Sequence, residues 1–592
     1  MKNQLKKSIS VLLACVLLLC TATPLAGAVN IKDKLESAAS DLLPLGKKGA
    51  YSVVEDILTG ALNLAQKAIP DRKDMIDPSQ YQSENFYPGT ETFLKQPAKN
   101  AQWSLGYSCA SLVPDDWQEH DYYLGGFIGI ENGFSNHVEE VIDDMRVRVI
   151  ALSDGSSRGT TLFGTIDAIG VSNKDIRAIR GIVAKEAAKR GITLNGINVS
   201  STHCHSCIDT QGLWTDLFKK MFKNIFAAIT GFFKLENGTD ETYLSFLRQT
   251  VADAMLDALS KMTPGKLTYA VKDIGEQYFN NKNRKSATSL PSELHRFMFV
   301  PDDANSKPTI IANLGAHPDV AGLPTESNSG RALSGDYVYY IGEELEKHGY
   351  NFMFFNGAIA GIYIGRGPSS DGLDLERRYQ ISERYGREIA RFLMAMTMTE
   401  KEIYASDLYD AKTIEQERAA STDYTLWCEN WKPVTAREVS PLLNLRLKEV
   451  RVPVTNPLIL LAGKLKLANY DILKDKKGNY SVITEIGYLQ LDDIPVAFVP
   501  GELVTDLYAG GASLTKSGSV NYSDFGHASL KELFGENTLC FGLTNDAIGY
   551  IVPDNDYKFV LFDDHYQESI SLGQATASTL MIAFEELARE IG

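Results

Sequence analysis

The stretch NVSSTHCHSCIDTQGLW, residues 198–214, brings two histidines and two cysteines together directly after a run of β-branched and small residues. Imidazole and thiolate groups are the usual protein ligands of zinc. In an extended segment, His203 and His205 lie two residues apart and point to the same face, whereas Cys204 points away. Three interpretations are open: a metal site, a redox pair formed by Cys204 and Cys207, or a hydrogen-bonded pair of histidines at a strand end.

Two further residues follow apolar runs in the same manner. His317 ends the run NLGAH and precedes a proline, and Glu502 follows the run VAFVPG. Two histidines and one carboxylate are a common ligand set of catalytic zinc, which keeps one position open for water. The structural alternative for Glu502 is a place at the start of a helix. A zinc site therefore requires that the ends of three predicted strands meet.

The elements that position these residues alternate along most of the chain. Strands are predicted over 145–154, 160–170, 196–201, 267–272, 295–300, 309–315 and 351–356, and helices over 173–191, 241–261, 336–348 and 376–398. The last third is β-rich, within 480–504 and 539–553, before a closing helix over 573–590. This order predicts an α/β fold of mixed β-sheets flanked by helices, with the active site at strand ends.

The composition is that of a packed globular protein: 592 residues, of which 44% are hydrophobic and 23% charged. The formal net charge is −16. A surface this negative repels phosphate backbones, so we expect no nucleic-acid partner. Five cysteines follow residue 28, an odd and sparse set that does not form a disulfide framework. A single bridge between Cys204 and Cys207 stays open.

The N-terminus has a basic start, an apolar run and the small-residue ending Ala26-Gly27-Ala28. This pattern predicts a signal peptide over residues 1–28 and a secreted or extracytoplasmic protein. A lipoprotein anchor at Cys15 is less favoured, because the apolar core before it is short. Residues 29–95 form a predicted helical N-terminal extension, and residues 96–592 hold the α/β part. No stretch after residue 28 is long and apolar enough to span a membrane.

Five stretches, taken together and in order, resemble the neutral/alkaline, non-lysosomal ceramidases. They are NVSSTHCHSC, GAHP, VPGEL, GLTNDAIGYIVP and DHYQESISLG. The resemblance covers roughly residues 100 to 590. It implies that residues 96–592 are the catalytic domain of that family, without its C-terminal immunoglobulin-like domain. It further implies a zinc-dependent amidohydrolase that cleaves the N-acyl amide of ceramide-type sphingolipids to a fatty acid and a sphingoid base.

The resemblance also assigns roles to seven residues. The implied zinc ligands are His203, His317, Glu502 and Tyr550. The implied catalytic residues are His205, Arg284 and Tyr566. Zinc lowers the pKa of a bound water to about 7 and polarises the amide carbonyl. The histidine would then protonate the departing amine, while the arginine and the second tyrosine stabilise the tetrahedral oxyanion.

The chain departs from the family at several positions. Cys204 stands where the family has threonine, and Cys207 stands where it has glycine; a thiol so close to the metal is a ligand or forms a disulfide. The stretch FFNGAIAGIY, residues 354–363, lacks the family's G-D pair and offers no nucleophile at Asn356. Two alternatives follow: a zinc amidase acting on an acylated amino acid or cell-wall component, or a degenerate, non-catalytic lipid-binding relative.

Residues 213–234, directly after the histidines, read as a basic amphipathic helix rich in aromatic residues. One helical stripe consists of Leu213, Leu217, Met221, Ile225, Ala228 and Phe232, and the lysines lie elsewhere. Such a helix either lies in a bilayer interface or packs as an ordinary core helix. The first interpretation predicts peripheral membrane contact beside the pocket for a lipid amide substrate.

Overall fold

The computed structural model describes residues 59–60, 62–126, 136–283, 289–321, 332–365, 375–408, 431–559 and 566–592. The predicted signal peptide and the first half of the predicted extension lie outside these residues. Residues 62–68 are helical, and residues 70–102 contain no α-helix and follow an irregular path on which Gly89 bridges to Arg446. No helix in the described ranges has the length and apolar character needed to cross a membrane.

The main sheet has nine strands and mixes parallel with antiparallel pairs. Its strands are β1 (Trp103–Ser111), β3 (Arg146–Ser153), β4 (Thr160–Ile166), β5 (Leu194–Ser201), β6 (Thr263–Asp273), β8 (Glu293–Pro301), β9 (Thr309–Leu314), β11 (Asn351–Asn356) and β13 (Arg437–Glu438). The order is β11-β9-β8-β6-β1-β3-β4-β5, with β13 paired to β6. The pairs β9–β11 and β4–β5 are parallel. The predicted strands are thus confirmed.

A second sheet occupies the β-rich last third. It consists of β14 (Leu443–Pro453), β15 (Leu473–Lys474), β16 (Tyr480–Leu491), β17 (Ile494–Phe498) and β19 (Leu539–Phe541). Three two-stranded ribbons accompany the sheets. They pair β18 (Glu502–Leu503) with β20 (Tyr550–Ile551), β7 (Phe279–Asn281) with β12 (Ile362–Ile364), and β2 (Glu140–Val141) with β10 (Ala332–Leu333).

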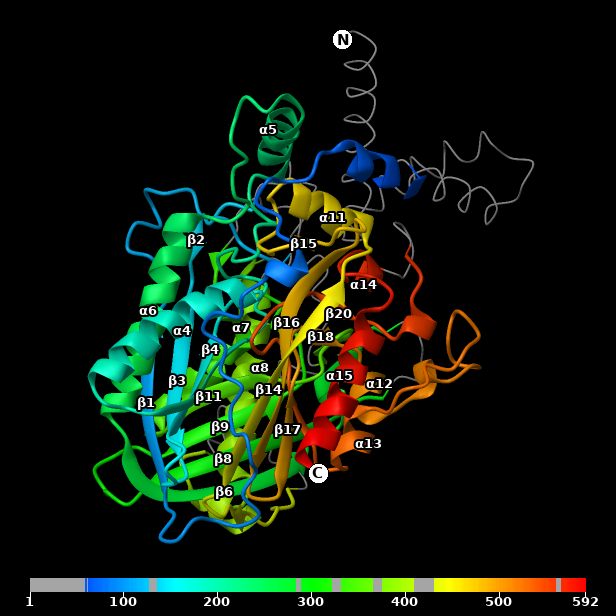
Figure 1. Cartoon of the computed structure of the whole chain (residues 1–592). Helices are drawn as coiled ribbons and strands as arrows, with labels where there is room; N and C mark the ends of the chain where they lie inside the picture. The colour runs from blue at the N-terminus through cyan, green and yellow to red at the C-terminus, as the bar shows by residue number, and fades with distance from the viewer. Residues whose placement is uncertain are drawn as a thin grey trace, which may run out of the picture.

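The two sheets pack face to face between outer helices (Figure 1). Large apolar side chains fill the space between the sheets, among them Phe163, Phe355 and Phe498. The other face of the main sheet is covered by α4 (Asn173–Lys189) and α6 (Glu241–Ser260), and by α7 (Asp336–Lys347) and α8 (Leu375–Ala395). The closing helix α15 (Thr576–Ile591) covers the outer face of the second sheet. The predicted α/β class with flanking helices is therefore confirmed.

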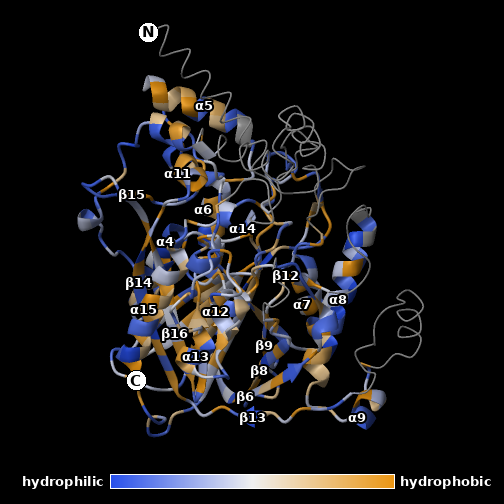
Figure 2. Ribbon diagram, turned by 90° about the vertical axis from the view of Figure 1, so that its right-hand side faces the viewer, coloured by the Kyte–Doolittle hydropathy of each residue, from blue (hydrophilic) through white to orange (hydrophobic). Residues whose placement is uncertain are grey.

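Local sequence explains why the helices begin and end where they do. Ser172 is the N-cap residue of α4, and its hydroxyl donates to Asp175 rather than capping a backbone N–H. Gly191, with φ of 68°, follows the helix in the left-handed region that glycine adopts without strain. The helix α5 (Leu217–Thr230) lies apart from the layers, at one end of the molecule beside α11 (Pro457–Lys464) (Figure 1, Figure 2).

The two edges of the main sheet, β11 and β5, come together at one end of the sheet. Asn356, the last residue of β11, donates from Nδ2 to the carbonyl of Thr202, just after β5, at 2.7 Å. The backbone N–H of His205 donates to the carbonyl of Pro318, after β9, at 3.0 Å. The loops after strands β5, β9 and β11 therefore form one connected cluster.

Candidate metal centre

His203 stands at the first turn after β5 in a conformation that few non-glycine residues adopt. Its φ is 66°, in the left-handed region. The loop is therefore not extended, as the sequence suggested, but turned at this residue. The imidazole Nδ1 lies 2.8 Å from the carbonyl oxygen of Ile169 and the side chain is 5% exposed. A strained backbone at a predicted ligand is typical of functional sites.

His317 and Glu502 reach the same place from two other elements. His317 follows β9, is fully buried, and has its Nδ1 2.8 Å from the carbonyl oxygen of Ile362. Glu502 begins β18, three residues before α12 (Thr505–Ala509), so it does not cap that helix. Its Oε2 lies 3.0 Å from Nε2 of His317 and 3.2 Å from Nε2 of His203. One carboxylate oxygen thus faces two imidazole nitrogens.

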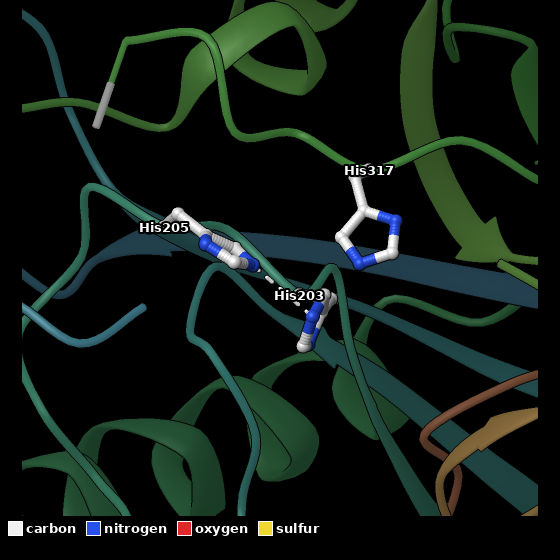
Figure 3. A group of neighbouring side chains, drawn as sticks. All are labelled: His203, His205 and His317. Carbon is white, nitrogen blue, oxygen red and sulfur yellow. Dashed lines mark hydrogen bonds between the residues drawn. The ribbon is translucent and has the colours of Figure 1, made fainter. Parts of the chain in front are cut away.

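The three imidazoles turn toward one another from two loops (Figure 3). One ring nitrogen from each of His203, His205 and His317 lies within 4.8 Å of the others, a spacing that suits a shared metal ion. A carbonyl accepts from Nδ1 only when Nδ1 carries the proton, so in the neutral form of His203 and His317 the lone pair is on Nε2, the atom that faces Glu502. Metal-binding histidines are fixed in this way by outer partners. The donor set suits zinc, and other divalent ions accept it too.

Electrostatics favour the metal-binding forms of these groups. Burial opposes the charged form of Glu502, but His203 and His317 outweigh it and lower the pKa of this carboxyl group well below its usual range. Burial, together with the two neighbouring histidines, lowers the pKa of His205 well below 6.5. The cluster therefore presents a carboxylate and a neutral imidazole at neutral pH.

His205 is positioned by a glycine. Its Nε2 lies 3.1 Å from Nε2 of His203. A Cβ atom added to Gly126, whose φ is +118°, would lie 2.6 Å from Cβ of His205. Since real side chains do not approach so closely, only glycine at position 126 allows this placement of the ring.

Three tyrosines line the other side of the cluster. Tyr550 is paired with Glu502 in the β18–β20 ribbon, and its ring lies 5.6 Å from the ring of Tyr566 in an edge contact. The hydroxyl of Tyr566 lies 3.0 Å from that of Tyr363, whose ring stacks on His317 at 4.7 Å. Burial and the Glu502 carboxylate raise the pKa of Tyr550 well above 10. This phenol is therefore protonated unless a cation lies beside it.

Arg284, the remaining predicted residue, lies outside the described residues. Its neighbour Asn283 is described and lies beside the tyrosines. Asn283 donates from Nδ2 to the carbonyl of Ala360 at 3.1 Å, and its Oδ1 accepts from Gln567 at 3.3 Å. The chain therefore approaches the site one residue before the arginine.

The two cysteines face away from the imidazoles. Cys204 and Cys207 are free thiols, fully buried in the core beneath the main sheet. Their sulfurs lie 3.2 Å and 3.4 Å from the carbonyl oxygen of Ser334. Burial raises the pKa of both thiols. Both cysteines are therefore buried thiols outside the histidine cluster. They form no disulfide with each other in this structure, and they are not among the grouped metal ligands.

Two residues at the site escaped the sequence analysis. Tyr363 ends the stretch FFNGAIAGIY, which was singled out only because it lacks the G-D pair of the ceramidases. Asp319 is 5% exposed, and its pKa is raised to about 7 by burial, against the opposing effect of His317. A signal for Asp319 was present, because it stands two residues after a predicted ligand. Nothing in the sequence distinguished Tyr363 from 26 other tyrosines.

The layered sheets and the cluster at the strand ends define an α/β protein with a candidate metal centre. No protein-family profile and no curated protein matches the sequence. The solved structure of neutral ceramidase from Pseudomonas aeruginosa matches with a TM-score of 0.53 and 12% identity, over 83% of this chain and 74% of that one. A structure described as ceramidase complexed with C2 matches with a TM-score of 0.51 and 12% identity, over 83% and 75%. The chain thus has the fold of the neutral ceramidases.

Proposed function

We propose that this protein is an exported, zinc-dependent amidohydrolase that cleaves the N-acyl amide of ceramide-type sphingolipids. One observation carries the proposal: at the strand ends, Oε2 of Glu502 lies 3.0 Å from Nε2 of His317 and 3.2 Å from Nε2 of His203. Two imidazoles and a carboxylate are the usual protein ligands of a catalytic zinc site. The shared fold with neutral ceramidases supports the choice of an amide lipid as substrate.

His203, His317, Glu502 and Tyr550 would hold the ion. When bound, zinc supplies a Lewis acid that polarises the carbonyl and lowers the pKa of water to about 7. Tyr550 is the strand partner of Glu502 in the β18–β20 ribbon, so it would reach the ion from beside that carboxylate. The carbonyls of Ile169 and Ile362 orient the two histidines through Nδ1.

The remaining residues would move protons and stabilise charge. His205, 3.1 Å from His203, transfers the proton of the attacking water to the departing amine. Tyr566 and Arg284 donate to the oxygen of the tetrahedral intermediate, each worth about 3 kcal/mol of barrier if well aligned. The hydroxyls of Tyr363 and Tyr566 share a hydrogen bond of 3.0 Å, which fixes the hydroxyl of Tyr566. The products are a fatty acid and a sphingoid base.

The proposal includes peripheral contact between residues 213–234 and the membrane that holds the substrate. A ceramide has no charged group, so its amide stays at the bilayer surface with both chains in the hydrocarbon. An enzyme that cleaves this amide therefore works at the interface.

Product identification tests the proposal. The purified protein is incubated with a defined ceramide, with and without a zinc chelator, and the products are identified by mass spectrometry. Equal release of fatty acid and sphingoid base, lost with the chelator and restored by zinc, is the expected result. Release of fatty acid from acylated amino acids but not from ceramide would show that the protein is an amidase of another substrate class. A zinc-loaded protein that cleaves no N-acyl amide would be a non-catalytic relative.

A matched pair of variants ties the activity to the site. His205→Ala removes the proposed proton shuttle, whereas His527→Ala removes a histidine that pairs with Glu585 on the far surface. We expect the first to lower kcat by about a hundredfold or more and the second to leave it unchanged. Equal effects of the two variants would contradict the assignment of His205.

A further inference from the structure

The helix α5 carries two apolar faces, and only one of them is buried. Met221 and Ile225, on the stripe expected from the sequence, are 0% and 4% exposed. Met221 and Ile225 therefore face the core, as the core-helix interpretation expects, whereas Phe232, past the end of the helix, is exposed. The helix is attached through Asn224, whose Nδ2 donates to the carbonyl of Leu465 at 2.7 Å.

The opposite face is apolar as well, and it is exposed to solvent. Its members are spaced at helical intervals and continue past the end of the helix: Phe222, Phe226, Ile229, Phe232 and Phe233, with exposures between 39% and 83%. We call this set the aromatic stripe. Across the described ranges, every exposed phenylalanine belongs to it. Scattered exposed apolar residues are ordinary, but a continuous row of them marks an interaction surface.

Lysines border the aromatic stripe. Residues 213–236 contain four lysines, one aspartate and one glutamate, a net charge of +2 (4 − 2), in a chain whose net charge is −16. Lys219 lies 3.9 Å from Asp216 and Lys223 pairs with Glu236, yet their side chains are 82% and 56% exposed, and Lys234 is exposed as well. Aromatic residues flanked by lysines are the composition of helices that lie in the headgroup region of bilayers.

We propose that the aromatic stripe inserts into the surface of a bilayer that contains anionic phospholipid. The positive charge beside the aromatic stripe favours an anionic lipid surface over a second copy of the chain. Two copies of the chain related by a twofold axis would bring two segments of charge +2 against each other, whereas anionic headgroups attract them. The helix lies at one end of the molecule, clear of the sheets, so a flat surface can reach it (Figure 1, Figure 2).

The stripe is connected to the metal centre through a short, ordered segment. Only eleven residues separate His205 from the first residue of α5. The buried carboxylate of Asp209 accepts from the backbone N–H groups of Gln211 and Gly212 at 2.8 Å and of Trp214 at 3.0 Å. Docking of the stripe therefore fixes the position of the histidine loop relative to the lipid surface. This role rests on the proposed function, although lipid binding itself does not.

Vesicle flotation tests the proposal without requiring hydrolysis. The full chain is mixed with vesicles of phosphatidylcholine, or of phosphatidylcholine with phosphatidylglycerol. We expect flotation with the anionic vesicles, reduced by added salt, and at least about tenfold weaker binding for the triple variant Phe222→Ser, Phe226→Ser, Phe233→Ser. Tyr522→Ser, which removes a 75% exposed aromatic ring elsewhere, is the matched control and should float like the parent.

Further measurements identify the occupant and check the fold. Lys219→Gln with Lys234→Gln should weaken binding to anionic vesicles only, and melting curves show that each variant is folded. A photo-crosslinking phenylalanine analogue at position 226 should label lipid. Crosslinks to a second copy, or to residues 1–58 in the presence of vesicles, would overturn the proposal, as would a parent protein that does not float or a triple variant that floats equally well.

Failure of this proposal is distinguishable from failure of the proposed function. The triple variant should keep its zinc content and its activity on detergent-dispersed ceramide, because the stripe lies outside the metal centre. A protein that floats with vesicles but never cleaves ceramide would support the membrane contact and contradict the amidohydrolase function. A protein that cleaves dispersed ceramide but never floats would support the amidohydrolase function and contradict the membrane contact.

Discussion

Each imidazole in the centre is oriented by a backbone carbonyl, and this decides what its other nitrogen can do. The carbonyls of Ile169 and Ile362 accept from Nδ1 of His203 and His317, so in the neutral form of each ring the Nε2 lone pair faces Glu502. Without a cation, at least one Nε2 must be protonated to hydrogen-bond the carboxylate. With a cation, all three donors are satisfied at once. The residue-scale geometry therefore favours a bound metal ion over a histidine pair that only packs.

Glu502→Gln tests the carboxylate as a ligand. The amide keeps the size of the side chain but loses its negative charge, so zinc affinity should fall by more than the roughly 10- to 100-fold that follows loss of an outer partner. Zinc content by mass spectrometry of the metal, and ceramide turnover, give the readout. Glu293→Gln, a change at a partly exposed residue of β8, is the control. Full zinc occupancy in Glu502→Gln would remove this residue from the ligand set.

Tyr363→Phe tests the hydrogen bond that fixes Tyr566. The phenylalanine ring preserves the stacking on His317, so zinc content should not change. Loss of the hydroxyl should lower kcat about tenfold with little change in KM, and less than Tyr566→Phe, which removes an oxyanion donor worth roughly 100-fold. A double variant should be no worse than Tyr566→Phe alone, because Tyr363 acts through Tyr566. Additive losses would show that Tyr363 acts by another route.

At the scale of elements, the strands and helices could be predicted, but the loops between them could not. Alternation of apolar runs located β3, β5 and β9 within a few residues, and a glycine marked the end of α4. The left-handed turn at His203 could not be predicted, because the carbonyl that its side chain contacts belongs to Ile169, 34 residues earlier in the chain. The exposed face of α5 was missed for a similar reason: both faces of this helix are apolar, and only packing decides which is covered.

The role of Asn356 also could not be predicted from the sequence. Sequence comparison with the ceramidases made it notable as a missing nucleophile. In the structure its side chain is fully buried and links the two edges of the main sheet through Thr202. Its role is to join the loops that carry the site, which no local pattern could reveal.

An ion network joins α4 to the second sheet, and its loss should destabilise the fold. Glu485 of β16 is buried and accepts from Arg180 at 2.8 Å through both carboxylate oxygens. Glu485→Gln leaves Arg180 buried without its counter-charge, which typically costs about 3–5 kcal/mol. Thermal unfolding should show a clearly lower Tm, while Glu449→Gln, at the more exposed edge of the network, should have a small effect. An unchanged Tm in Glu485→Gln would contradict a structural role.

At the scale of the whole molecule, four layers hold loops from distant parts of the chain at one place. Residues 203 and 317 follow strands of the main sheet and residue 502 follows β17 of the second sheet, so the centre exists only when the layers are assembled. The sequence predicted the α/β class from the order of elements. It could not predict the strand order of the main sheet, because pairing partners such as β1 and β6 lie more than 150 residues apart.

The same ion network predicts how the stability of the whole molecule depends on pH. Burial opposes ionisation of Glu485, but Arg180 and Arg177 outweigh it and lower its pKa in the folded state. A carboxyl group with a lowered folded pKa stabilises the protein above its unfolded pKa, about 4.3, and this contribution is lost as the pH falls further. The Tm of the parent should therefore fall more steeply below about pH 4.3 than that of Glu485→Gln. Parallel profiles would contradict this contribution.

The most direct test of the central claim is the position of the metal itself. A crystal of the protein purified with zinc, measured on both sides of the zinc absorption edge, locates the ion by its anomalous scattering. We expect one strong peak about 2.1 Å from Nε2 of His203 and of His317 and from an oxygen of Glu502. A fully loaded protein whose zinc lies elsewhere, or one that binds none at this cluster, would contradict it.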